Sequence, residues 1–160
     1  MDSLQLNLEK IEILATKFRD AIEDYVQDAT KNCISLPPSL KSFPEGSCGD
    51  TSLLLGIYLR ENGINAYYVH GERGNISDST WQTHAWLQYG RIIIDITADQ
   101  FEEIKKNVIV TTDSRWHKSF EQVEKRDNYQ LNDCPSSDLE TAYRNILARI
   151  DTPRPNMHQN

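Results

Sequence analysis

The sequence predicts an α+β fold in which helices pack on a small antiparallel sheet. Apolar residues recur at spacings of three and four over residues 3–30 and again over 137–150, which indicates two amphipathic helices. Between them, residues 64–71, 83–97 and 107–112 are rich in β-branched and aromatic residues, which favour strands. A third helix, residues 48–62, follows a loop rich in proline and glycine and ends at Asn62-Gly63.

The length and composition indicate a single domain over residues 1–150, followed by a disordered tail over residues 151–160 that contains two prolines. The chain has 160 residues and a net charge of −7, so we expect no nonspecific binding to nucleic acid. No run of about 18 apolar residues occurs and the N-terminus lacks the pattern of a signal peptide. We therefore expect a cytoplasmic protein with no membrane partner.

The helical segments differ in how clearly they are marked. The first helix has a regular apolar face, which consists of Leu4, Leu8, Ile11, Leu14, Phe18, Ile22 and Tyr25. The last begins at a capping-box pattern, Ser137-x-x-Glu140. Residues 118–132 are charged and poorly patterned, so we assign them no regular structure. The three cysteines, Cys33, Cys48 and Cys134, are too few and too scattered for a disulfide framework.

One of these cysteines stands where a loop becomes a helix. The free N–H groups and partial positive charge of a helix N-terminus favour a thiolate, which predicts a lowered pKa and a reactive Cys48. The same N–H groups can bind an oxyanion formed at an attacked carbonyl. Its neighbours Gly46, Ser47 and Gly49 are small, which lets a substrate backbone approach the sulfur. The alternative is that Cys48 is an ordinary small buried residue.

A nucleophilic cysteine needs a base, and a hairpin over residues 83–97 supplies one. A two-residue turn at Tyr89-Gly90 would place His84 directly opposite Asp95 on one face. A three-residue loop would instead turn the two side chains to opposite faces. The alternatives are an ordinary polar cross-strand pair, or His70 as the base.

A metal site formed by Cys48, His70, His84 and Asp95 is a further alternative. These are permissible zinc ligands, but the short-range spacing of a zinc motif is missing. We therefore expect no metal and no cofactor.

Three segments taken together resemble a known family. Gly-Ser-Cys48 opens a helix, His84-Ala-Trp86 opens a hairpin, and Asp95-Ile-Thr97 closes it. This order resembles the C…HAW…DxT pattern of the transglutaminase-like, papain-related cysteine superfamily, over roughly residues 40–100. The resemblance implies a papain-like core in which Cys48 is the nucleophile, His84 the base and Asp95 the residue that orients it.

The chain departs from papain-like enzymes in one respect. Those enzymes often place a glutamine shortly before the cysteine, and positions 41–47 contain none. The second oxyanion donor therefore stays open, with Gln100 as a candidate. Gly49, Trp81 and Trp86 are further candidates for contacts with the oxyanion or the substrate.

The expected function is acyl transfer through a thioester, most directly by a cysteine peptidase or amidase that acts on a protein, a peptide or a small amide. A protein-glutamine deamidase or a transglutaminase would use the same residues. Two other classes remain: a noncatalytic interaction module on the same fold, and a metal-dependent hydrolase.

Overall fold

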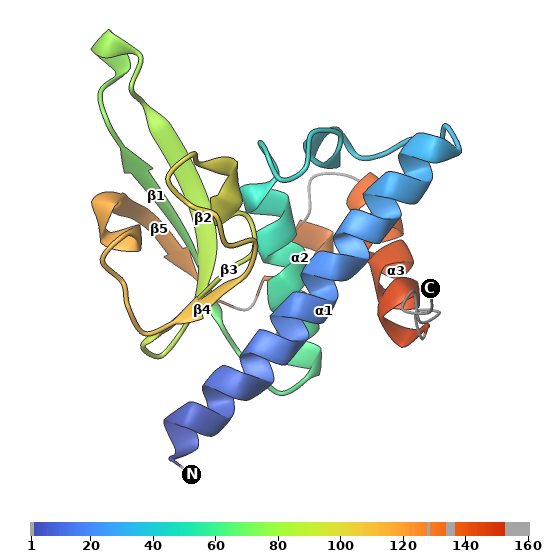
Figure 1. Ribbon diagram of the computed structural model, residues 1–160, viewed down its shortest axis with the longest axis horizontal. Coiled ribbons are helices and arrows are strands. Elements are labelled where there is room, and N and C mark those ends of the chain that lie inside the picture. Colours follow the sequence, from blue (N-terminus) through green and yellow to red (C-terminus); the bar gives the residue numbers. More distant parts are fainter. Residues whose placement is uncertain (1, 128, 134–136, 153–160) are drawn as a thin grey trace, which may run out of the picture.

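The computed structural model describes residues 2–127, 129–133 and 137–152, and this part of the chain forms three α-helices and a five-stranded antiparallel sheet (Figure 1). The helices are α1 (Ser3–Lys31), α2 (Cys48–Glu61) and α3 (Ser137–Asp151). The strands are β1 (Tyr67–Arg73), β2 (Gln82–Tyr89), β3 (Ile92–Asp95), β4 (Ile109–Thr111) and β5 (Glu121–Arg126). The α+β fold class is confirmed.

All three helices lie on one side of the sheet, with α2 next to it (Figure 1). The apolar face expected for the first helix is buried, and Phe18 is its centre. The Phe18 ring lies 5.3 Å from that of Tyr58 in α2 and 6.4 Å from that of Tyr143 in α3. One side chain of α1 thus joins the three helices into a single core.

The strand order in the sheet is β4-β3-β2-β1-β5, so the hairpin β2–β3 lies in the middle. Its turn differs from the prediction by one residue, because the loop is Gly90-Arg91 rather than Tyr89-Gly90. Leu87 therefore pairs with Ile94, and His84 does not lie directly opposite Asp95 as expected. The register moves by two residues, and this keeps both side chains on the same face.

The edge strand β5 was not expected from the sequence. It pairs with β1, with an irregularity between His70 and Gly71. Its side chains are almost all exposed, so no apolar alternation marks it, and it is held by backbone pairing. The bounds of two other strands also differ from the prediction: β1 spans Tyr67–Arg73 rather than residues 64–71, and β4 spans only Ile109–Thr111 rather than residues 107–112.

Both faces of the sheet are covered. The main core lies between the helices and the sheet and includes Ala85, Leu87, Ile92, Ile94 and Ile96 from the hairpin and the residue after it. A second cluster covers the opposite face and consists of Val69, Trp86, Ile93, Phe101, Phe120 and the partly buried Trp116. This second cluster forms the surroundings of the candidate site.

The last helix, α3, ends at Asp151, one residue beyond the end expected from the sequence. The rest of the expected tail, from residue 153 on, and Cys134 lie outside the described residues. None of the described helices is long and apolar enough to cross a membrane.

Candidate active site

Cys48 is the first residue of α2, as the sequence predicts. The residue before it, Ser47, is a type that commonly caps helices, yet its side chain does not cap α2. Its hydroxyl donates instead to the Pro44 carbonyl at 2.7 Å. The first N–H groups of α2 therefore stay available for an anion beside the Cys48 sulfur.

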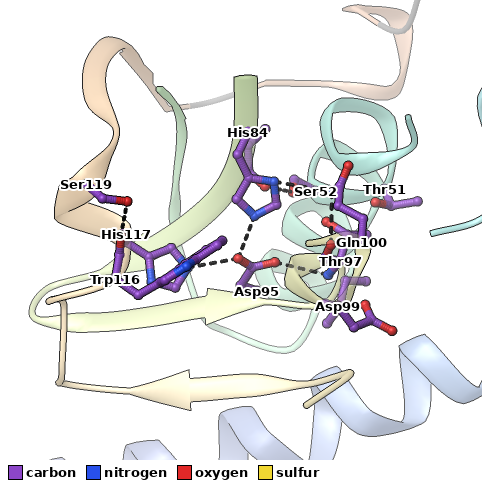
Figure 2. Close-up of polar contacts among 12 residues, drawn as sticks. Thr51, Ser52, His84, Asp95, Thr97, Asp99, Gln100, Trp116, His117 and Ser119 are labelled. Carbon is purple, nitrogen blue, oxygen red and sulfur yellow. Dashed lines mark hydrogen bonds and ion pairs between the residues drawn. The ribbon is translucent and has the colours of Figure 1, made fainter. Parts of the chain in front are cut away.

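Figure 2 shows His84 between the start of α2 and Asp95. Its Nε2 lies 2.7 Å from Asp95 Oδ2, and the two residues are 0% and 1% exposed. The other side of the ring serves the thiol, because Cys48 hydrogen-bonds to the His84 side chain and to the Ala85 backbone N–H. The structure thus brings together the three residues that the sequence predicts as a triad.

The electrostatics of the three residues are coupled. Burial alone would raise the pKa of the Cys48 thiol, but its hydrogen bonds with His84 and Ala85 and the charge of His84 lower it below its ordinary value. Burial would lower the pKa of His84, but the Asp95 charge and hydrogen bond, with the contact to Cys48, raise it to about 9. Despite full burial, Asp95 keeps a pKa well below its usual range because of the His84 charge and hydrogen bonds from His117 and His84. This pattern favours a thiolate–imidazolium pair at neutral pH.

His117 is a site residue that the sequence did not reveal. Its Nε2 lies 2.8 Å from Asp95 Oδ2, the oxygen that also binds His84, and the residue is 3% exposed (Figure 2). The other carboxylate oxygen accepts the Thr97 backbone N–H at 3.0 Å. Three donors therefore fix the Asp95 carboxylate. No local motif links His117 to Asp95, since 22 residues separate them.

Aromatic rings enclose the His84 side chain. The His84 ring lies 5.1 Å from Phe101, 5.6 Å from Trp116, 5.7 Å from Phe120 and 5.8 Å from Trp86, measured between ring centres. Trp86 is 5% exposed, so it belongs to the wall of the site. This wall keeps water from the His84–Asp95 contact and strengthens it electrostatically.

The remaining sequence candidates occupy different positions. Trp81 is 41% exposed just before β2, where a substrate can reach it. Gln100 lies beside the triad: its Nε2 is 2.9 Å from the Thr97 carbonyl and 3.3 Å from His84 Nδ1. Gly49 follows Cys48 in the first turn of α2. His70 pairs with Ala85 across β1 and β2, and no contact with Asp95 is formed by it within the described residues.

A buried arginine positions the segments on both sides of the site. Arg19 of α1 is 4% exposed and donates to the Ile96 carbonyl at 2.6 Å and to both oxygens of Asp99 at 2.8 Å. Its guanidinium also stacks 4.5 Å from the centre of the Phe43 ring. It therefore ties the loop before Cys48 and the turn after Asp95 to the same helix.

The only His/Cys/Asp/Glu group in the described part of the chain with a geometry suited to a metal is His84, Asp95 and His117. It differs from the set weighed from the sequence, because it contains neither Cys48 nor His70. Its imidazole–carboxylate contacts of 2.7 and 2.8 Å are hydrogen-bond lengths. Both histidines are therefore hydrogen-bonded to Asp95, and the arrangement fits a group of hydrogen-bonded side chains better than a set of metal ligands.

Comparison with known proteins agrees with this geometry. The family model described as the transglutaminase-like superfamily matches residues 3–118, which include α1, Cys48, His84, Asp95 and His117. Searches of curated proteins and of solved structures gave no match. Because the family model covers well over half of the 160 residues, the chain belongs to the transglutaminase-like superfamily.

Proposed function

We propose that this protein is a cysteine-dependent acyl-transfer enzyme, most directly a peptidase or amidase. The observation that carries the proposal is the buried His84 ring, which contacts the Cys48 thiol on one side and the Asp95 carboxylate on the other. Membership in a superfamily of largely enzymatic proteins supports it.

In the first half of the reaction, the Cys48 thiolate attacks the carbonyl carbon of an amide and a C–S bond forms. The carbonyl oxygen becomes an oxyanion, which the free N–H groups at the start of α2 stabilise. The oxyanion collapses, the C–N bond breaks, and His84 donates its Nδ1 proton to the leaving amine. An acyl-thioester and a neutral imidazole remain.

In the second half, water attacks the thioester while His84 accepts its proton. Collapse of the second tetrahedral intermediate breaks the C–S bond and releases a carboxylic acid, which loses its proton to solvent, and the thiolate–imidazolium pair is restored. Asp95 holds the imidazole in the required tautomer and stabilises its charged form. An amine in place of water would give transamidation, and a glutamine side chain as the acyl donor would give deamidation.

The test is the pH dependence of Cys48 alkylation by iodoacetamide, in a Cys33→Ser/Cys134→Ser background. An ordinary thiol with a pKa of about 8.5 is only about 0.3% ionised at pH 6. A Cys48 thiolate paired with His84 should react at pH 6, and His84→Ala should slow this reaction roughly 30- to 300-fold. The range allows for the lower intrinsic nucleophilicity of a thiolate with a low pKa.

The matched control is His70→Ala, which removes the competing histidine and should leave the rate at pH 6 unchanged. Slow labelling with an ordinary midpoint and no dependence on His84 would defeat the proposal and favour a noncatalytic interaction module. If alkylation behaves as expected, chelator treatment should not change it. Stoichiometric zinc and loss of activity with chelator would instead favour the metal-dependent class.

A further inference from the structure

The tetrahedral intermediate of the proposed reaction needs more than one donor. The backbone N–H of Cys48 supplies the first, and Gln100 was the sequence candidate for the second. The Gln100 amide nitrogen carries two hydrogens. One is donated to the Thr97 carbonyl at 2.9 Å, and the amide nitrogen is turned toward the His84 ring, 3.3 Å from Nδ1.

Tyr68 of β1 offers another donor on the α2 side of the sheet. Its hydroxyl oxygen lies 3.5 Å from the point that a Cβ atom on Gly49 would occupy, so it stands over the first turn of α2. Gly49 leaves that space open. A carbonyl attacked by Cys48 would have the backbone N–H groups of α2 on one side and this hydroxyl nearby.

The Tyr68 ring is held in place by its neighbours. The residue is 7% exposed, the Tyr129 ring packs edge-on at 6.4 Å, and the Arg126 guanidinium lies 4.9 Å from the ring centre. A donor that is already fixed needs no reorganisation when charge develops, which is the condition for effective oxyanion stabilisation.

The hydroxyl is also free to donate. No hydrogen bond from it to another described residue is formed, and Tyr68 keeps 7% of its surface exposed. Burial, followed by the nearby charge of Cys48, raises the pKa of Tyr68 to about 12. The O–H proton is therefore retained at neutral pH.

We propose that the Tyr68 hydroxyl is the second oxyanion donor of the acyl-transfer reaction, acting with the backbone N–H of Cys48. The inference rests on the proposed function and names a further catalytic residue for it. As the thiolate adds to the carbonyl, Tyr68 donates a hydrogen bond to the developing C–O⁻ group. The proton stays on Tyr68, and the bond weakens when the C=O group re-forms.

Two reagents separate this role from any effect on the thiolate. Iodoacetamide reacts with Cys48 by displacement of iodide from a saturated carbon, so its transition state contains no oxyanion. p-Nitrophenyl acetate acylates Cys48 through a tetrahedral oxyanion and releases p-nitrophenolate, which is measured by absorbance. Both reactions need the same Cys48–His84 pair.

In the Cys33→Ser/Cys134→Ser background, Tyr68→Phe should lower the acylation rate by about 100-fold, in line with the loss of one oxyanion donor. Its alkylation rate at pH 6 should stay within about twofold of the parent, which also shows that the site is folded. Tyr67→Phe, the exposed neighbour in β1, should leave both rates unchanged.

An acylation rate in Tyr68→Phe within threefold of the parent would overturn the assignment. A parallel fall of both rates would overturn it as well, because Tyr68 would then act on the thiolate or on the fold. If the parent protein itself labels at pH 6 only as an ordinary thiol, the proposed function fails, and this outcome is recognised without reference to Tyr68.

Discussion

Asp95→Asn tests the electrostatic basis of the site, because it removes one charge with little change in shape. In the wild type, burial lowers the pKa of His84, while the Asp95 charge and hydrogen bond raise it, and the balance is a pKa of about 9. Without that charge, burial, the largest effect on this group, opposes only the weaker contact with Cys48, and the pKa of His84 should fall to 6.5 or lower. The difference corresponds to roughly 3 kcal/mol, at about 1.36 kcal/mol per pH unit.

The assay is NMR titration of protein labelled at the histidine Cε1 carbons, which reports the protonation of each imidazole directly. The chain contains four histidines, and the His84 signal is assigned by its loss in His84→Gln. Asp113→Asn is the matched control, because Asp113 is an exposed carboxylate that pairs with Arg115 and does not contact His84.

The expected outcome is a His84 midpoint near 9 in the wild type and in Asp113→Asn, and at or below 6.5 in Asp95→Asn. A wild-type midpoint at 6.5 or below would refute the argument that Asp95 outweighs burial. A midpoint that stays near 9 in Asp95→Asn would show that another group holds the charge on His84.

Three further predictions concern stability, measured as the free energy of unfolding in urea. Because the pKa of His84 is raised in the folded protein, its contribution to the free energy of unfolding is fully present below pH 6.5 and is lost as pH rises through about 9. The difference in free energy of unfolding between wild type and His84→Gln should therefore narrow by up to about 3 kcal/mol between pH 6 and pH 9.5. A difference that stays constant over this range would contradict the prediction. Arg19→Met should cost about 3 kcal/mol, because it breaks a buried ion pair, whereas the exposed Arg144→Met should change stability by less than about 0.5 kcal/mol. His117→Phe removes a donor to the buried Asp95 charge and should cost about 2 kcal/mol, with part of the loss restored in His117→Gln; equal costs for the two variants would count against this role.

The parts of the fold that the sequence predicts well are those with a strong local pattern. α1 and α2 have apolar faces and clear ends, and both fall within about one residue of the expected bounds. In the hairpin, alternate residues such as Ala85 and Leu87 point into the main core, which is the periodicity that marks a strand in the sequence. The strand β5 has no such pattern, because its side chains are exposed and it pairs with its neighbour through backbone hydrogen bonds.

The candidate site divides along the same line. Cys48 can be predicted from the sequence, because the start of the helix that lowers the pKa of its thiol is marked by neighbouring residues. Arg19 is not, because its partners Ile96 and Asp99 lie 77 and 80 residues away in the chain and meet it only when α1 docks on the sheet. In the sequence alone, Arg19 resembles any other charged residue on the polar face of an amphipathic helix.

The contact between His84 and Asp95 follows from the hairpin even though the predicted turn was displaced. Moving the loop from Tyr89-Gly90 to Gly90-Arg91 shifts the pairing by two residues, which is the side-chain period of a strand. The two residues become diagonal neighbours on one face, and their long side chains still meet at 2.7 Å. His117 has no comparable constraint, since β4 and an irregular loop lie between it and Asp95. Residues on one hairpin can therefore be paired from sequence by parity alone, whereas a residue delivered by a separate segment requires the folded structure.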